Sequence, residues 1–549
     1  MTLSRRQLLL RAAVLSVAPS AGASRVEASP GLFKPNWSSL VSRYRAPDWF
    51  ADAKFGIWAH WSAQCVPEFG DWYARRMYQQ GDPAYDDHLK RYGHPSKTGF
   101  MEIDNLWKAE HWEPEQLMTL YQRAGAKYFV ALANHHDNFD TYDSRYHAWN
   151  SVKVGPKRDI VGTWAKIARE RGLRFGVSNH SAHAWHWFQV AYGYDAEGPS
   201  AGVRYDAYRL TKADGKGKWW EGLDPQELYC GRSMVIPDGI GSVEEMKEWH
   251  LKHDRVWTED PPAVNLAFTR KWFLRCRDLI DKYRPDLIYF DNFDLPLGQT
   301  GLDITAHYYN ANMSWHRGAL EAVVNAKQLP AEHRAAVVED VERGFAAGIL
   351  PAPWQTDTCI GHWHYNRAIF DNHTYKSAEN VVQRLCDTVS KNGNLLLSIP
   401  VRGDGTIDED ERAILEALAG WMAVNGEAIF SSRPWRVFGE GPTRTEAGMM
   451  SESSVKPFTP ADIRFTCKGA NLYAEILGMP SGDTVSIVTL AAGSPVTKGQ
   501  VERVEMLGLS DPLDFVRDTK GLSVRLPAAP KAGFVPVFKI SGTGLVGAR

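Results

Sequence analysis

The sequence predicts an α/β protein in which a (β/α) barrel (TIM-like) domain precedes a C-terminal all-β sandwich domain. The 549 residues are more than one hydrophobic core usually holds, so we expect at least two domains. Between Trp49 and about Pro400, short β-branched or aromatic runs alternate with helical patterns, which is typical of a parallel sheet closed into a barrel. After Pro434, short alternating strands separated by turn residues predict the sandwich.

The first 28 residues have the pattern of a twin-arginine-type signal peptide. Arg5 and Arg6 precede an apolar stretch that is interrupted once, at Arg11, and small residues follow it. An ordinary secretory signal that carries paired arginines is the alternative. The apolar part is too short to cross a bilayer, and no other stretch of about 20 apolar residues occurs. We therefore expect a soluble bacterial protein, periplasmic or secreted, with no membrane partner.

Residues 29–432 carry the predicted barrel. A long segment at 188–262 is rich in Gly, Tyr, Trp and acidic residues, and we expect this insertion to lie over the strand ends. The predicted strands are 55–61, 127–134, 174–178, 287–290, 335–339 and 394–399. The predicted helices are 113–124, 160–171, 263–283, 377–391 and 407–423.

Residues 433–549 carry the predicted sandwich. Its strands are short, and turn residues such as those at 518–521 separate them. The predicted strands are 464–467, 471–477, 485–490, 501–507, 514–516, 522–526 and 535–540.

Composition and cysteine spacing exclude several classes of protein. A net charge of -2 leaves no basic surface for nucleic acid, so we expect no nucleic-acid partner. The six cysteines lie far apart without a CxxC pair, so we expect buried thiols and no zinc framework. The 21 Trp and 21 Tyr fit either a large core or a site that stacks on sugars. We expect no cofactor, and the sequence does not indicate an oligomeric state.

Polar side chains gather where the predicted barrel strands end. His60 follows the first strand, residues 134–137 follow the second, and residues 179–180 follow the third. Asp291 and Glu342 follow later strands. Because the C-terminal strand ends of a (β/α) barrel carry its functional site, these positions predict one site built from several strands.

Asp291 directly follows the buried run at 287–290, where a carboxylate is either catalytic or the partner of an Arg or Lys. Asp294 lies past the strand end, and we expect it to be solvated. Hydrolysis of a glycosidic bond needs two carboxyl groups, one to attack or activate water and one to protonate the leaving oxygen. From the residues alone the partner of Asp291 stays open among Glu339, Asp340 and Glu342.

The histidines at the strand ends allow two interpretations. His135 and His136 are adjacent and would face opposite ways on a strand, which disfavours a shared metal ion. Hydrogen bonding to sugar hydroxyls is the favoured role for these two and for His60. We therefore expect no metal, and a metal-dependent barrel hydrolase remains the alternative. For His183 and His186 a structural role is credible.

Several sequence blocks follow one another in order between about residues 40 and 435. They lie at 49–61, 69–75, 124–128, 135–137, 143–144, 149–151, 157–159, 172–176, 284–291, 391–397 and 424–430. Together these blocks resemble the α-L-fucosidases of glycoside hydrolase family 29. The resemblance implies a retaining, exo-acting hydrolase that removes terminal α-L-fucosyl groups from a fucosylated oligosaccharide or glycoconjugate.

The resemblance also implies roles for single residues. Asp291 stands at the nucleophile, and Glu342 fits the acid/base, which is the least fixed position of the family. Substrate-binding positions are implied for His60, Asp71, Trp72, His135, His136, His180 and Trp363.

Three departures from the family pattern concern the site. Asp71 stands where many members have Glu, and the pair Asn179-His180 stands where several members have Tyr. Gln355 replaces a Glu that many members carry, which removes a rival acid and favours Glu342. The changes at Asp71 and at Asn179-His180 keep open the alternative of a catalytically inactive fucose-binding protein. The aromatic residues expected against the sugar are Trp58, Trp72, Phe290 and Trp363.

Overall fold

The computed structural model describes residues 31–527 and 533–547. The predicted signal peptide at residues 1–28 lies outside the described residues, so it stays a prediction. Within the described ranges, no helix is long and apolar enough to cross a membrane. Residues from Phe33 onward pack as one unit.

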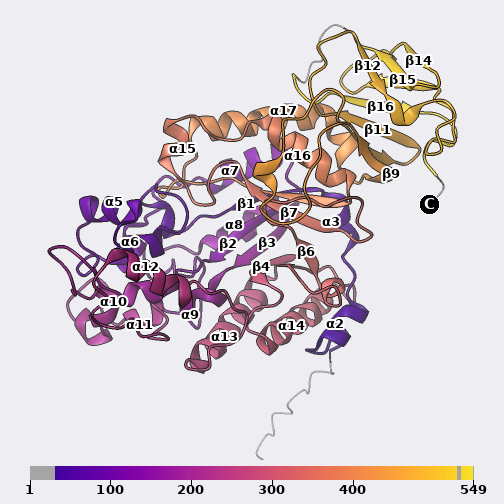
Figure 1. Ribbon diagram of the computed structural model, residues 1–549. Helices are drawn as coiled ribbons and strands as arrows, with labels where there is room; N and C mark the ends of the chain where they lie inside the picture. Colours follow the sequence, from indigo (N-terminus) through magenta and orange to yellow (C-terminus); the bar gives the residue numbers. More distant parts are fainter. Residues whose placement is uncertain (1–30, 528–532, 548–549) are drawn as a thin grey trace, which may run out of the picture. The chain divides into compact units, whose positions relative to one another are not determined.

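The central element of the fold is a closed barrel of parallel strands (Figure 1). In the described part of the chain, eight strands pair in sequence order, and β8 pairs with β1 to close the sheet. The strands are β1 (Phe55–Ala59), β2 (Tyr128–Asn134), β3 (Arg174–Asn179), β4 (Leu287–Phe293), β5 (Val323–Lys327), β6 (Val338–Asp340), β7 (Trp354–Cys359) and β8 (Gly393–Ser398). The predicted α/β fold class is therefore confirmed.

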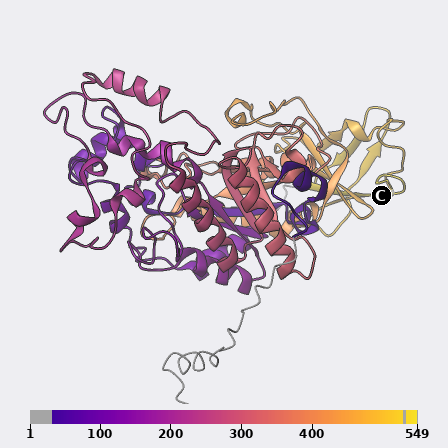
Figure 2. The same cartoon turned by 90° about the horizontal axis from the view of Figure 1, so that it is seen from below.

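Helices surround the strands, and Figure 2 shows neighbouring helices of this ring side by side. Their apolar sides pack on the sheet; α16, for example, is capped by Ser377 and buries Val382, Leu385 and Val389. The ring helices are α7 (Pro114–Arg123), α8 (Ile160–Glu170), α13 (Leu266–Tyr283), α14 (Gln299–Trp315), α16 (Ala378–Ser390) and α17 (Glu409–Ile429). Shorter helices are α2 (Trp37–Arg43), α3 (Asp48–Ala53), α4 (Tyr73–Arg76), α5 (Pro83–Arg91), α6 (Phe100–Leu106), α9 (Ala184–Trp187) and α15 (Arg367–Asp371).

Four barrel strands differ from the prediction. The strands β5 and β7 were not predicted, and the strand before Glu342 was predicted at 335–339. That strand is the shorter β6, since residues 334–336 form a 3-10 turn. The β4 strand also extends past its predicted end at residue 290, so Asp291 lies within the strand.

The insertion at 188–262 folds into short elements with a small core of its own. Its helices are α10 (Asp206–Arg209), α11 (Pro225–Leu228) and α12 (Val243–Lys252). The buried residues Tyr194, Ala196, Ile236 and Met246 form the small core. Glu259, near its end, accepts hydrogen bonds from the side chain of Asn292 and from the backbone N–H of Phe293 at 2.9 Å. The insertion is thereby attached to the C-terminal end of β4.

The C-terminal part of the chain forms two antiparallel sheets, as predicted. One sheet has the order β13-β16-β11-β10-β9 and the other the order β12-β15-β14. Trp421 of α17 donates to the carbonyl oxygen of Val535, and Arg464 pairs with Asp387 of α16 at 2.7 Å, so this part packs on the barrel helices. The strands are β9 (Arg433–Glu440), β10 (Ile463–Lys468), β11 (Asn471–Ile476), β12 (Thr484–Ile487), β13 (Arg503–Met506), β14 (Phe515–Arg517), β15 (Leu522–Arg525) and β16 (Val537–Ser541).

Candidate active site

A pocket of about 560 Å³ opens at the C-terminal ends of the barrel strands. All nine residues predicted for the site line it, although they come from separate parts of the chain. These residues are His60, Asp71, Trp72, His135, His136, His180, Asp291, Glu342 and Trp363. The convergence follows from the fold, because parallel strands of a closed barrel end on one face.

Asp291 lies where β4 departs from regular pairing. The register between β4 and β5 shifts between Tyr289 and Phe293, and such irregularities re-aim side chains near active sites. One carboxylate oxygen of Asp291, Oδ2, lies 3.3 Å from Nε2 of His136 and 3.1 Å from Nδ1 of His180. Both polar neighbours face the carboxylate, so it is held in one orientation.

Lys327, the last residue of β5, lies between the two predicted catalytic carboxylates. Its Nζ donates to Oδ1 of Asp291 and, at 2.5 Å, to Oε2 of Glu342. Burial lowers the pKa of Lys327, but Asp291 and Glu342 outweigh burial and raise it well above its usual value. Burial likewise raises the pKa of Asp291, but the Lys327 ammonium and His180 hold that pKa well below its usual range. Asp291 is therefore ionised at neutral pH.

The structure separates Glu342 from the other acids that the sequence left open. Glu342 lines the pocket, two residues past the end of β6. Glu339 is 3.4 Å from Arg334 outside the pocket, and buried Asp340 accepts a hydrogen bond from Gln355 at 2.7 Å. Asp294 pairs with His333 at 3.2 Å and does not line the pocket either. Only Glu342 among these four acids can meet a ligand in the pocket.

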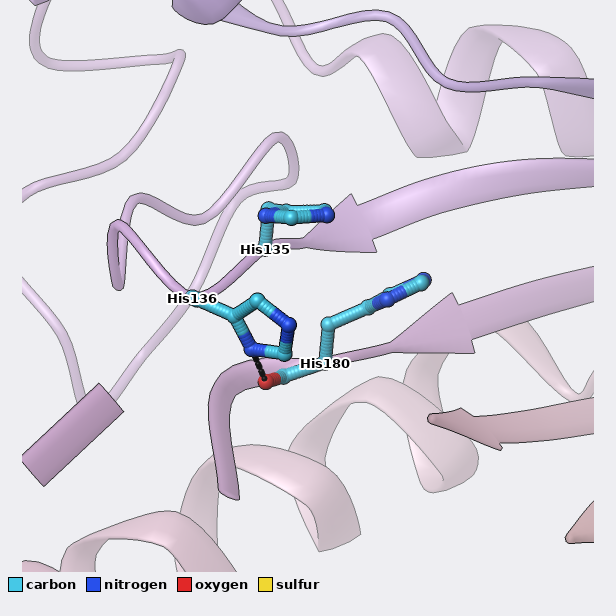
Figure 3. Close-up of side chains that lie close together, drawn as sticks. All are labelled: His135, His136 and His180. Atoms are coloured by element: carbon cyan, nitrogen blue, oxygen red, sulfur yellow. Dashed lines mark hydrogen bonds between the residues drawn. The ribbon is translucent and has the colours of Figure 1, made fainter. Parts of the chain in front are cut away.

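His135, His136 and His180 lie at the ends of the adjacent strands β2 and β3 (Figure 3). Their ligand nitrogens lie within 4.8 Å of one another, which is close enough to consider a metal ion. However, Nδ1 of His136 donates to the backbone oxygen of His180 at 2.7 Å. The rings of His135 and His180 stack with an interplanar angle of 24°, so their edges do not converge on one point. This arrangement suits separate hydrogen bonds to a ligand better than one metal ion.

Three imidazoles of the pocket, those of His60, His135 and His180, are neutral at pH 7. Burial holds the pKa of His60 and of His135 well below the usual value, and it lowers the pKa of His180 to about 4. A neutral imidazole has one donor and one acceptor nitrogen, which matches a hydroxyl group. His60 already hydrogen-bonds Ser398 at 3.0 Å and His135 bonds Gln64 at 3.1 Å, so each ring is fixed and keeps a second nitrogen. The set can therefore bind a ligand rich in hydroxyl groups.

Asp71 has a clear structural role in the pocket wall. Its carboxylate accepts hydrogen bonds from the backbone N–H groups of Trp363, at 3.2 Å, and His364, at 2.8 Å. Burial raises the pKa of Asp71, but the hydrogen bond and charge of His364 outweigh it and leave the pKa below its usual value. The ionised Asp71 thus fixes the segment that presents the Trp363 ring.

Aromatic residues close the floor of the pocket. The rings of Trp58 and Tyr289 lie 4.6 Å apart, both residues are buried, and both line the pocket. Trp72 and Trp363 also line it as expected, but Phe290 does not. Phe290 points to the helix layer, with its ring 5.9 Å from Trp272 of α13, since it precedes Asp291 on the strand.

Beneath the floor, the hydroxyl of Tyr289 donates to Oδ2 of Asp357 at 2.7 Å. Burial and the charge of Glu342 raise the pKa of Asp357 to about 7. Asp357 is therefore a buried carboxyl group that lines the pocket together with the more exposed Asp71, Asp291 and Glu342.

Several pocket residues were not identified from the sequence. Lys327 and Asp357 belong to the two overlooked strands. Trp257 comes from the insertion, which confirms that this segment reaches the strand ends. Other overlooked lining residues are Arg76, His183, Tyr289, Phe293, Arg343, His362, Met449 and Met450.

Comparison with known proteins identifies the family. The family described as Alpha-L-fucosidase matches residues 21–427. The Homo sapiens tissue alpha-L-fucosidase is 27% identical over 530 residues, which cover 93% of this chain and 92% of that protein. A Thermotoga maritima alpha-fucosidase solved in complex with fucose has 26% identity and a TM-score of 0.65, over 92% of this chain and 100% of that chain. A structure of the same enzyme with a mechanism-based inhibitor has 26% identity and a TM-score of 0.66, over 93% of this chain and 100% of that chain. The chain therefore belongs to the alpha-L-fucosidase family and is a glycoside hydrolase.

Proposed function

We propose that this protein is a retaining, exo-acting α-L-fucosidase that hydrolyses terminal α-L-fucosyl linkages of glycans. Asp291 is the nucleophile, Glu342 is the acid/base, and the reaction passes through a covalent fucosyl-enzyme intermediate. A related Thermotoga maritima enzyme was solved with fucose, which supports fucose as the sugar that this pocket holds.

The bridging position of Lys327 is the observation that carries the proposal. One oxygen of Asp291 and one of Glu342 accept from the same Nζ atom. Two acceptors on one nitrogen can be no more than about 6 Å apart, which is twice a hydrogen-bond length. Retaining glycosidases hold their two carboxyl groups roughly 5–5.5 Å apart, whereas inverting enzymes need about 6.5–9.5 Å to admit a water molecule. The close spacing favours the retaining mechanism.

In the first step, an oxygen of Asp291 attacks the anomeric carbon of the fucosyl group. The bond from that carbon to the glycosidic oxygen breaks, and the proton of Glu342 moves to the departing oxygen. The low pKa of Asp291 keeps it ionised and ready to attack. The products of this step are a fucosyl ester on Asp291 and the free aglycone.

In the second step, water attacks the same carbon while the Glu342 carboxylate takes a proton from it. The ester bond to Asp291 breaks, and the released fucose keeps the anomeric configuration of the substrate. Neutral His60, His135 and His180 hold the sugar hydroxyls throughout. Because Trp58 and Tyr289 close the floor, a glycan chain cannot run through the pocket and only its end can enter, which supports exo action.

The anomer that is released first tests this proposal. The purified protein is incubated with 4-nitrophenyl α-L-fucoside, and the products are followed by proton NMR before mutarotation. We expect α-L-fucose to form first. Initial β-L-fucose would mean an inverting mechanism, and binding of fucose without release of nitrophenol would mean an inactive fucose-binding protein.

A metal-dependent hydrolase is the second candidate, because three histidine nitrogens lie within 4.8 Å of one another. Dialysis against a chelator separates the two candidates. The fucosidase proposed here keeps its activity after this treatment, whereas a metal-dependent enzyme loses activity and recovers it with added metal.

Export directed by residues 1–28 also remains a proposal that rests on the sequence alone.

A further inference from the structure

A segment that follows β9, at residues 446–452, lies along the loop that carries Glu342. The backbone N–H of Met450 donates to the carbonyl oxygen of Glu342 at 2.8 Å. The backbone N–H of Gly448 donates to the carbonyl oxygen of Phe345 at 3.0 Å, and the backbone N–H of Glu452 donates to the carbonyl oxygen of Arg343 at 2.9 Å. The predicted acid/base therefore shares backbone hydrogen bonds with a segment about a hundred residues further along the chain.

The contact between the two segments is too close for side chains at its centre. A Cβ atom at Gly344 would lie 2.0 Å from the carbonyl oxygen of Gly448. Arg343 and Met450 both have a positive φ, of 44° and 58°, which is uncommon for such side chains. Backbone strain of this kind collects at functional sites, where the surrounding structure holds it.

The half-buried carboxylate of Glu452 anchors the segment. Glu452 pairs with Lys376 at 2.8 Å and lies 3.6 Å from Arg384, and it accepts a hydrogen bond from Thr358 at 2.9 Å. Lys376 in turn donates to the backbone oxygen of Cys359 at the end of β7. The segment is thereby fixed to β7 and α16 as well as to the loop that carries Glu342.

This anchoring places two methionines in the wall of the pocket. Met449 and Met450 line the pocket beside Glu342 and Arg343, and Met450 is 59% exposed although it is apolar. The guanidinium group of Arg343 lies over the Trp363 ring at 4.8 Å, and these two flat groups line the same pocket as the methionines.

The position next to Glu342 decides which part of the substrate meets this surface. An acid/base must lie within hydrogen-bonding reach of the leaving oxygen, so its loop is on the leaving-group side. The histidines that bind hydroxyls come from β1–β3, on other strands of the barrel. Met449 and Met450 therefore lie where the aglycone would be, not where the fucosyl group is held.

We propose that Met449, Met450 and Arg343 form an aglycone subsite that takes a leaving group with a flat, apolar face. The aromatic ring of an aryl group and the C–H face of a pyranose both offer such a face. Methionine suits this role because its flexible, polarisable side chain adapts to different shapes. The inference rests on the proposed fucosidase function and adds the chemical class of the aglycone.

The test compares three substrates that share the fucosyl group. An aryl fucoside and a fucosyl-galactose disaccharide have an aglycone with an apolar face, whereas α-L-fucosyl fluoride has almost none. The variant Met449→Ser/Met450→Ser removes the apolar contact but keeps the backbone hydrogen bonds. Met479→Ser is the matched control, since Met479 is 37% exposed and does not line the pocket.

We expect the double variant to lose about tenfold in kcat/KM, or about 1.4 kcal/mol, on the aryl fucoside, the disaccharide or both. Its kcat/KM on fucosyl fluoride should equal that of the wild-type protein and of Met479→Ser. The substrate that loses activity shows which apolar face is bound. An equal loss on all three substrates, or no loss on any, would overturn the inference. If the wild-type protein cleaves none of them, the proposed function itself is wrong.

Discussion

Replacing Lys327 by Met should shift the pH dependence of the enzyme, because the lysine is the cation between two carboxylates. The side chain is 4% exposed and donates to both Asp291 and Glu342. An opposite charge within about 4–6 Å lowers a carboxyl pKa by roughly 1–3 units. Loss of that charge removes the lowering influence, whereas burial, which raises the pKa of Asp291, remains.

The sign of the shift follows from the role of Asp291, which must be ionised to attack. With Lys327 present, the pKa of Asp291 is held low, and kcat/KM falls only in strong acid. In Lys327→Met the acid limb of the kcat/KM profile should move to higher pH by about 1–3 units. Loss of one member of a buried ion pair should also destabilise the fold by about 3–5 kcal/mol.

The assay is kcat/KM for 4-nitrophenyl α-L-fucoside as a function of pH, since this parameter reports the free enzyme. Lys391→Met is the matched control, because Lys391 is an equally buried lysine that pairs with Asp387 at 2.8 Å outside the pocket. It should lower stability without moving the acid limb. An acid limb that stays in place in Lys327→Met would refute the assignment of Lys327 and Asp291 as a coupled pair.

Three further predictions concern single carboxyl groups. Glu342→Ala should lose about 10²–10⁴-fold in kcat/KM on a fucosyl disaccharide but should still release fluoride from fucosyl fluoride. The control Glu339→Ala should keep both activities. Equal losses from both variants would contradict the acid/base role of Glu342. Asp357→Asn should remove a titration near pH 7 from the kcat/KM profile, since burial and Glu342 raise the pKa of Asp357 to about 7; an unchanged profile would show that Asp357 does not act on the site. Burial raises the pKa of Glu475 in β11 to about 8, so the protonated side chain favours folding and the stability of the protein should fall as pH rises toward 8. In Glu475→Gln the Tm should decline less than in the wild-type protein between about pH 5 and about pH 9. An equal decline of Tm in the variant and the wild type would count against the buried acid.

The barrel could be predicted in outline because most of its strands are continuous apolar runs. The β5 and β7 strands were overlooked because they carry polar residues that point into the barrel. In β7, Gln355 accepts from the hydroxyl of Tyr128 at 3.0 Å, and Asp357 accepts from Tyr289. Every residue of β7 is buried, and its polar side chains bond side chains of β2, β4 and β6 inside the barrel instead of marking a loop.

The site could be predicted as far as it follows strand ends. His60, His135 and Asp291 converge because the barrel brings consecutive strand ends together, and one sequence is enough to indicate that. Lys327 was not identified because its strand was not. Met449 and Met450 could not be found at all, because their place beside Glu342 depends on tertiary contacts of a distant segment, which carries no local pattern.

Covalent trapping of the glycosyl-enzyme intermediate identifies the nucleophile. The protein is incubated with a 2-deoxy-2-fluoro-L-fucosyl fluoride, which slows hydrolysis of the ester, and is then digested for mass spectrometry. We expect one added fluorofucosyl group on the peptide that contains Asp291, and none in Asp291→Ala. A label on another residue, or full turnover with no label at all, would contradict Asp291 as the nucleophile.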